Sequence, residues 1–125
     1  MNFDSTDMIV LPGGMPGTLN LKAHEGLAKL IGNFNSDGKK LAAICAAPIV
    51  FGGLGLLDGR KAVCYPGFEG ELGNAEVPEN VAFVTDGNIT TSRGAGTAMD
   101  FALELIRVLE GKEASEHIRS SVIYR

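Results

Sequence analysis

Cys45 stands where an apolar strand and a helix are expected to meet. The segment Leu41-Ala-Ala-Ile-Cys45-Ala-Ala-Pro48 is typical of a buried strand that stops at the cysteine and continues at once into a helix. Pro48 suits the first turn of that helix, where its missing N–H costs nothing. The helix dipole and the free N–H groups of such a turn favour a thiolate, which makes this a nucleophile elbow with sulfur in place of serine oxygen. The alternative is an inert buried cysteine, and this segment alone leaves both interpretations open.

A glycine-rich turn, Pro12-Gly13-Gly14-Met15-Pro16-Gly17, follows another apolar strand. Glycine lets a backbone N–H approach a ligand closely. Loops at the carboxyl ends of neighbouring parallel strands converge on one crevice, so we expect this turn beside Cys45. The N–H groups of Gly14 and Ala46 would then form an oxyanion hole. The alternative is a tight turn without such a role. Nucleotide binding is not expected, because the turn lacks the Lys-Ser/Thr ending of a phosphate loop.

Arg93 and the turn Gly94-Ala-Gly96 mark a further strand-to-helix junction. An anion could bind at such a junction, although a tight turn alone also explains the glycines. The glycine pattern is too incomplete to indicate a dinucleotide site.

The composition is that of one globular domain without marks of nucleic-acid or membrane binding. The chain has 125 residues, a net charge of −4 and no basic block, which argues against a nucleic-acid partner. No apolar run is long enough to span a membrane, and the N-terminus lacks a signal-peptide pattern. Two cysteines without a disulfide framework indicate a cytoplasmic protein. We expect neither a cofactor nor a metal.

Strands and helices alternate around these residues. We expect helices over 19–34, 48–54 and 97–109, the last capped by Thr97 with Asp100, and a short helix over 113–119. Residues 69–77 are expected to be partly extended. The expected strands cover 8–11, 41–44, 61–65, 81–85 and 89–91, the last two joined by the hairpin turn Asp86-Gly87-Asn88. This alternation predicts a mainly parallel α/β sheet covered on both faces.

Four segments occur in an order and spacing that match one known family. They are Leu-Pro-Gly-Gly-Met-Pro-Gly (11–17), Ala-Ala-Ile-Cys-Ala-Ala-Pro (42–48), Cys-Tyr-Pro-Gly-Phe-Glu (64–69) and Thr-Ser-Arg-Gly-Ala-Gly-Thr (91–97). Together they resemble the ThiJ/PfpI family, in the branch of the Parkinson-associated deglycase. The resemblance implies one class I glutamine amidotransferase-like domain over 1–125, with a flavodoxin-like three-layer sandwich that is usually dimeric. It also implies that Cys45 is the nucleophile and that Gly14 and Ala46 supply the oxyanion-hole amides.

The family pattern is not matched everywhere. Tyr65 stands where many members place a histidine beside the cysteine. The two histidines, His24 and His117, do not lie at the ends of predicted strands, so we do not expect a Cys–His pair. Tyr65 then either hydrogen-bonds the substrate or the sulfur, or packs half-buried before Pro66.

The chain resembles the C-terminal two-thirds of a family member, and we expect it to be incomplete at its N-terminus. Family members begin with a further strand and a helix that opens with a glutamate, which contacts the cysteine and moves protons. The pattern assigns that role to none of Glu69, Glu71 and Glu76. We expect the sheet edge left open to be covered by the N-terminal segment as a separate piece, or by a second copy in a homodimer.

The resemblance implies a cysteine-dependent enzyme acting on small reactive carbonyls, as a glutathione-independent glyoxalase or deglycase, impaired in this form. Its alternatives are an oxidative-stress redox sensor or chaperone that uses the same cysteine, and a non-catalytic remnant. Other members of the family are intracellular peptidases or are linked to thiazole monophosphate biosynthesis. The expected small-molecule partner is an aldehyde.

Overall fold

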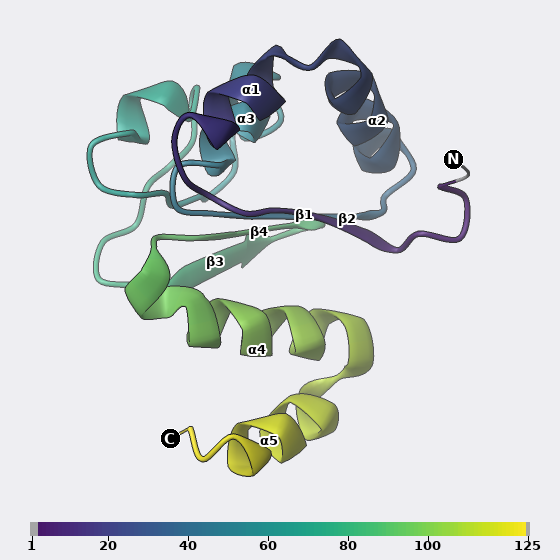
Figure 1. The fold of residues 1–125 in the computed structure, drawn as a ribbon, viewed down its shortest axis with the longest axis vertical. Helices are drawn as coiled ribbons and strands as arrows, with labels where there is room; N and C mark the ends of the chain where they lie inside the picture. Colours follow the sequence, from purple (N-terminus) through teal and green to yellow (C-terminus); the bar gives the residue numbers. More distant parts are fainter. Residues whose placement is uncertain (1–2, 125) are drawn as a thin grey trace.

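Among the described residues, the sheet has four strands in the spatial order β1 (Met8–Leu11), β2 (Lys40–Ile44), β4 (Ile89–Ser92) and β3 (Phe83–Asp86). The computed structural model describes residues 3–124. β1 pairs in parallel with β2, and β2 pairs in parallel with β4. β3 lies antiparallel to β4 across the predicted hairpin. The mainly parallel α/β sheet expected from the sequence is confirmed (Figure 1).

Helices cover both faces of this sheet. α1, α2 and α3 lie on one face, α4 lies on the other, and α5 packs on the outer side of α4 (Figure 1). The helices are α1 (Gly17–Ala23), α2 (Glu25–Ser36), α3 (Pro48–Gly53), α4 (Ala98–Glu110) and α5 (Lys112–Ser121), with short 3-10 helices at Glu69–Glu71 and Ala95–Thr97. Within residues 3–124, none of the helices combines the length and the apolar character needed to cross a bilayer.

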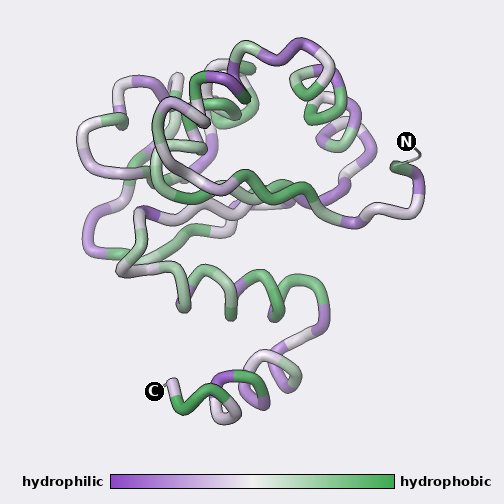
Figure 2. Tube along the Cα trace, viewed as in Figure 1, coloured by the Kyte–Doolittle hydropathy of each residue, from purple (hydrophilic) through white to green (hydrophobic). Residues whose placement is uncertain are grey.

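The largest apolar core lies between the sheet and the layer of α1, α2 and α3. β2 contributes Leu41 and Ala43, α2 contributes Ile31 and Phe34, and α3 contributes Phe51, all of them buried. Figure 2 shows the apolar colouring running along β1 and β2, between the helix layers. Each large buried side chain adds about 1.5–3 kcal/mol of transfer free energy. This layer therefore fixes the two strands that end at the glycine turn and at the cysteine.

Residues 61–65 do not form the predicted strand. Apart from one isolated bridge between Lys61 and Glu76, the backbone N–H groups of this segment donate to separate partners. The Val63 N–H donates to the side-chain oxygen Oγ1 of Thr91 at 3.0 Å, and the Tyr65 N–H donates to the Cys45 carbonyl at 2.7 Å. Because no single neighbouring strand receives these bonds, the segment lies beside the sheet without joining its ladder.

The helix predicted over 19–34 is divided in two at His24. The backbone of His24 is extended, with φ −82° and ψ 105°, and its Nδ1 accepts the N–H of Leu27 at 2.9 Å. The imidazole therefore acts as the N-cap of α2, so that α1 ends at Ala23 and α2 begins at Glu25.

Thr97 occupies the N-cap position of α4 and Asp100 lies in its first turn, as predicted, but neither side chain makes a capping hydrogen bond to the helix. The Thr97 hydroxyl donates to the Gly94 carbonyl at 3.0 Å and shares a 2.8 Å bond with the Ser92 hydroxyl. Asp100 instead accepts the Tyr124 hydroxyl at 3.0 Å. Thr97 thus closes the turn between β4 and α4 and leaves the helix end without a side-chain cap.

Candidate active site

Cys45 occupies a strained position between β2 and α3. Its φ is +63°, in the left-handed region that residues other than glycine seldom adopt. Such a conformation costs about 1–3 kcal/mol and persists only where the surroundings enforce it. Here the Cys45 N–H donates to the Ser92 carbonyl at 3.2 Å, and the Cys45 carbonyl accepts the Tyr65 N–H at 2.7 Å. These two bonds hold the elbow in place, and Pro48 begins α3 as expected.

Gly13 is the glycine that touches the cysteine. A Cβ built on Gly13 would lie 2.3 Å from Cys45 Cβ, 3.1 Å from its Sγ and 2.8 Å from the Ile44 carbonyl oxygen. No side chain fits in this space. We did not predict this contact, although the two consecutive glycines of the turn could have indicated it. Only Gly14 of the pair has a positive φ, at +100°, so Gly13, the first glycine, is required by space and not by backbone conformation.

Two backbone N–H groups beside the thiol have no acceptor. Among residues 3–124, neither the Gly14 N–H nor the Ala46 N–H donates a hydrogen bond within the protein. The Gly14 carbonyl is used, because it accepts the Thr18 N–H at 2.9 Å at the start of α1. Cys45 itself is partly exposed. The turn therefore presents a reachable sulfur next to two free donors.

Tyr65 lies at the same edge of the sheet as Cys45, to which its backbone is bonded. Its side chain is 51% exposed. The ring packs over Gly94, where an added Cβ would lie 3.5 Å from a ring carbon, and meets the ring of Phe68 edge-on at 6.4 Å between centroids. The phenol is thus half packed against the neighbouring loop and half open to the solvent.

Neither histidine takes part in this arrangement. His24 caps α2, and His117 lies in α5, on the far side of α4 from the sheet (Figure 1). Of the residues that the structure describes, no imidazole or carboxylate hydrogen-bonds to Cys45. A Cys–His pair is therefore absent from the described part of the chain.

The glutamates of the segment 69–77 are engaged elsewhere. One accepts a backbone N–H, and two form ion pairs with exposed lysines. The contacts are Glu69 with the Gly67 N–H (2.8 Å), Glu71 with Lys22 (3.6 Å) and Glu76 with Lys61 (3.8 Å). None of these contacts brings a proton carrier to the sulfur of Cys45.

Cys64 differs from Cys45 although they lie close together. It is 2% exposed, and its Sγ donates to the Tyr65 carbonyl at 3.5 Å. Burial, followed by the nearby Glu69 carboxylate, raises the pKa of the Cys64 thiol to about 11. Both cysteines are free thiols, and Cys64 is held in the neutral, unreactive form.

Comparison with known sequences identifies the family. A model of the DJ-1/PfpI family matches residues 1–108. The chain is 42% identical over 120 residues to protein DJ-1 homolog B of Arabidopsis thaliana, covering 95% of this chain and 27% of that protein. It is 36% identical over 121 residues to protein dj-1beta of Drosophila melanogaster, covering 96% of this chain and 65% of that protein. The chain thus spans only part of the length of these relatives.

Solved structures give the same result. Drosophila melanogaster DJ-1beta superposes with a TM-score of 0.92 at 35% identity, over 98% of this chain and 66% of that one. Oxidized Toxoplasma gondii DJ-1 superposes with a TM-score of 0.90 at 37% identity, over 97% of this chain and 66% of that one. The sandwich is therefore flavodoxin-like, as expected from the motifs. On this evidence the chain belongs to the DJ-1/PfpI family.

Proposed function

We propose that this protein uses Cys45 as the nucleophile of an enzyme that acts on small reactive carbonyls. The observation that carries the proposal is the strained, partly exposed cysteine at the strand–helix elbow, with φ +63° and Gly13 in contact with it. Backbone strain of this kind clusters at functional sites. A relative from Pyrococcus abyssi, 35% identical over 114 residues, is named a deglycase, which supports the carbonyl class of substrate.

The first step needs only groups that lie at the elbow. The Cys45 thiolate adds to the aldehyde carbon, a C–S bond forms, and the π electron pair of the carbonyl moves to its oxygen. The free N–H groups of Gly14 and Ala46 would donate to this oxyanion, and a proton from solvent then gives a hemithioacetal. Tyr65 would orient the substrate with its exposed phenol.

Conversion of methylglyoxal to lactate needs a further proton transfer. A base removes the proton from the former aldehyde carbon, and a proton returns to the neighbouring carbonyl carbon, which gives a thioester. Water then cleaves the thioester and releases lactate and the Cys45 thiolate, so the whole sequence consumes one water and no oxidant. We assign this base to no described residue, because none with a suitable side chain hydrogen-bonds to Cys45. We therefore expect slow turnover.

Lactate formation by matched cysteine variants tests the proposal. The chain and its Cys64→Ser variant should both produce lactate from methylglyoxal. The rate of the Cys45→Ser variant should be at least about 100-fold lower, because this variant lacks the nucleophile. With ¹³C-labelled methylglyoxal, NMR should also detect the hemithioacetal in the first two proteins only. Equal rates in Cys45→Ser and the unchanged chain would contradict the proposal.

A redox sensor is the second candidate, and the oxidized state of the Toxoplasma gondii relative supports it. In this role peroxide oxidises the Cys45 thiolate to sulfenic and then sulfinic acid, and the altered site binds a partner. Peptide mass mapping after a mild peroxide dose should find two or three added oxygens on Cys45 before any on the four methionines. Oxidation spread evenly over Cys64 and the methionines would count against it.

We also propose that the free edge of β1 is covered in the working protein. β1 pairs with β2 alone among the described strands, and Val10 in it is 44% exposed. An unpaired parallel edge invites a further strand, from an N-terminal segment of the kind expected above or from a second copy. Light scattering of the purified chain should give a dimer. A monomer that melts cooperatively and turns over methylglyoxal at the rate of longer relatives would contradict this proposal.

A further inference from the structure

A polar cavity of about 470 Å³ lies beside the elbow, and the reaction proposed above does not use it. Its polar lining comes from three segments of the chain. The segment 63–69 provides the Cys64 thiol and the Glu69 carboxylate, the segment 77–80 provides Glu79 and Asn80, and Arg93 follows β4. The remaining lining is apolar. A volume of this order is that of a small-molecule site.

In the part of the chain that the structure describes, the cavity holds charges of both signs that form no ion pair with one another. Among residues 3–124, the guanidinium of Arg93 and the carboxylate of Glu79 make no hydrogen bond and no ion pair within 4 Å. Glu69 is ionised, because hydrogen bonds from its own backbone N–H and that of Gly67 lower the pKa of its carboxyl. One cation and two anions therefore face the same space, each with free capacity for a ligand.

The walls of this cavity are bonded to the Cys45 peptide on both sides. Arg93 directly follows Ser92, whose carbonyl accepts the Cys45 N–H at 3.2 Å. Cys64 directly precedes Tyr65, whose N–H donates to the Cys45 carbonyl at 2.7 Å. A molecule that bridges the two walls would thus lie within one residue of both hydrogen bonds that hold the elbow.

We propose that this cavity binds a small zwitterionic molecule, an α-amino acid with an aliphatic side chain. The Arg93 guanidinium takes the carboxylate in a two-pronged contact, and the ammonium lies against the carboxylates of Glu79 and Glu69. Val63 and Val77 in the lining accommodate the aliphatic side chain. A phosphate or other dianion is disfavoured by the two carboxylates, and a simple amine leaves Arg93 unpaired.

The test is direct binding to the whole chain by calorimetry, with L-valine, acetate and ethylamine as probes. Valine should bind with a Kd of about 1–10 mM, and acetate and ethylamine should each bind at least about tenfold more weakly, since each uses one side of the pair. Valine should shift the ¹H–¹⁵N NMR signals of the lining, from residues 63–69, 77–80 and 93. Equal binding of acetate and valine, or no heat and no shifts with valine, would overturn the proposal.

Variants separate the two halves of the site. Arg93→Met and Glu79→Gln should each weaken valine binding about tenfold or more, and Arg93→Lys should recover part of the loss. Lys61→Met is the matched control, because it removes an exposed cation that is close in sequence to the lining residue Val63 but lies outside the cavity. This variant should bind valine as the unchanged chain does. Cys45→Ser should also bind valine unchanged, so failure of this inference is distinct from failure of the proposed chemistry. Unchanged valine binding by Arg93→Met would overturn the proposal.

Discussion

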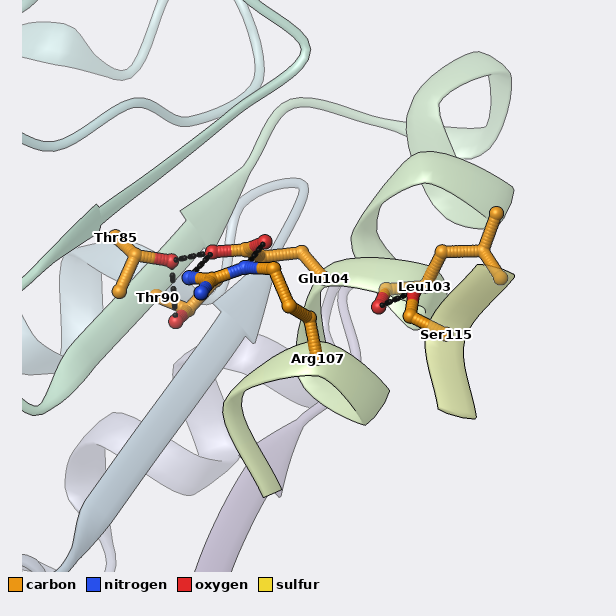
Figure 3. A network of polar contacts seen from close by, with 6 residues as sticks. All are labelled: Thr85, Thr90, Leu103, Glu104, Arg107 and Ser115. Atoms are coloured by element: carbon orange, nitrogen blue, oxygen red, sulfur yellow. Dashed lines mark hydrogen bonds and ion pairs between the residues drawn. The ribbon is translucent and has the colours of Figure 1, made fainter. Parts of the chain in front are cut away.

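Two regions of the molecule, the Cys45 elbow and the surroundings of Glu104, are held together in different ways. At the carboxyl edge, Cys45 is fixed by backbone hydrogen bonds and by contact with Gly13, without a side-chain hydrogen bond to its sulfur among the described residues. On the face of the sheet that α4 covers, the buried Glu104 of α4 is held by hydrogen bonds from other side chains. It accepts the Thr85 hydroxyl at 2.6 Å and the Arg107 guanidinium at 2.7 and 2.8 Å (Figure 3).

The network around Glu104 joins two strands of the sheet to the helix layer below it. Thr85 also shares a 2.9 Å hydrogen bond with Thr90, so the network spans β3, β4 and α4. At the residue directly before Glu104, the Leu103 carbonyl of α4 accepts the Ser115 hydroxyl of α5 at 2.8 Å (Figure 3). These bonds attach the two C-terminal helices to the sheet.

The difference predicts that the two regions respond to different perturbations. The space between Gly13 and Cys45 is filled, so the stability of the elbow should be sensitive to added atoms and insensitive to changes of charge. The network around Glu104 depends on an ionised carboxylate, so it is sensitive to charge and pH.

The largest effect should be the difference in reactivity between the two thiols. Burial raises the pKa of the Cys64 thiol from an ordinary value of 9.0 to about 11, which lowers its thiolate fraction about 100-fold, and the buried sulfur is also shielded from reagents. Cys45 should therefore react with iodoacetamide at least about 100-fold faster than Cys64 near neutral pH. Mass spectrometry of the two peptides over time measures both rates. Equal rates would mean that the elbow is only structural.

Gly13→Ala should destabilise the elbow by steric conflict. The new Cβ would lie 2.3 Å from Cys45 Cβ and 2.8 Å from the Ile44 carbonyl, so the backbone must move. We expect a loss of about 3 kcal/mol in the free energy of unfolding, at the upper end of over-packing costs, together with slower Cys45 alkylation. Urea denaturation and alkylation rates are the measurements.

Gly32→Ala is the matched control for that variant. Gly32 lies in α2, and a Cβ there meets nothing within 4 Å. This change should instead stabilise the chain by about 0.5–1 kcal/mol, because alanine favours the helix. If both alanine variants behave alike, the contact between Gly13 and Cys45 does not constrain the elbow.

Glu104→Gln should cost about 2 kcal/mol of stability near neutral pH, because hydrogen bonds to a charged group contribute about 1.5–3 kcal/mol. The Arg107 side chain is 48% exposed, so water compensates it in part. Thermal unfolding by calorimetry measures the effect. Glu110→Gln, an exposed glutamate in the last turn of the same helix, should leave the Tm almost unchanged. Equal shifts in the two variants would show that the network adds nothing.

The smallest effect should be the pH dependence of that loss. Hydrogen bonds from Arg107 and Thr85 hold the pKa of the Glu104 carboxyl below its ordinary value. The folded state therefore releases this proton more readily than the unfolded chain. The contribution is fully present above the unfolded pKa of ~4.3 and disappears as pH falls through the folded pKa. The stability difference between the chain and Glu104→Gln should shrink below about pH 4. A constant difference down to pH 2 would contradict this assignment.

The sequence by itself determined the features that arise from local pattern. The apolar run before Cys45 and the proline after it predicted β2, the elbow and the start of α3, because strand period and helix start are written in neighbouring residues. The hairpin turn at Asp86-Gly87-Asn88 was predicted for the same reason, since Gly87 supplies the positive φ of a tight turn. Parallel strands then had to bring the glycine turn and Cys45 to one edge.

The tertiary structure alone decided the features that depend on partners distant in the chain. Residues 61–65 have the composition of a strand, yet their backbone N–H groups donate to scattered partners, namely Asp86, Glu76, Thr91 and Cys45, so no ladder forms. Gly13 also depends on a distant partner, because Cys45, at the end of β2, fills the space beside it. Glu104 is a further case, because a helix pattern alone would not predict a buried glutamate. The two cysteines are expected to differ in reactivity because Cys64 is buried and Cys45 is partly exposed, a difference that residue type alone does not give.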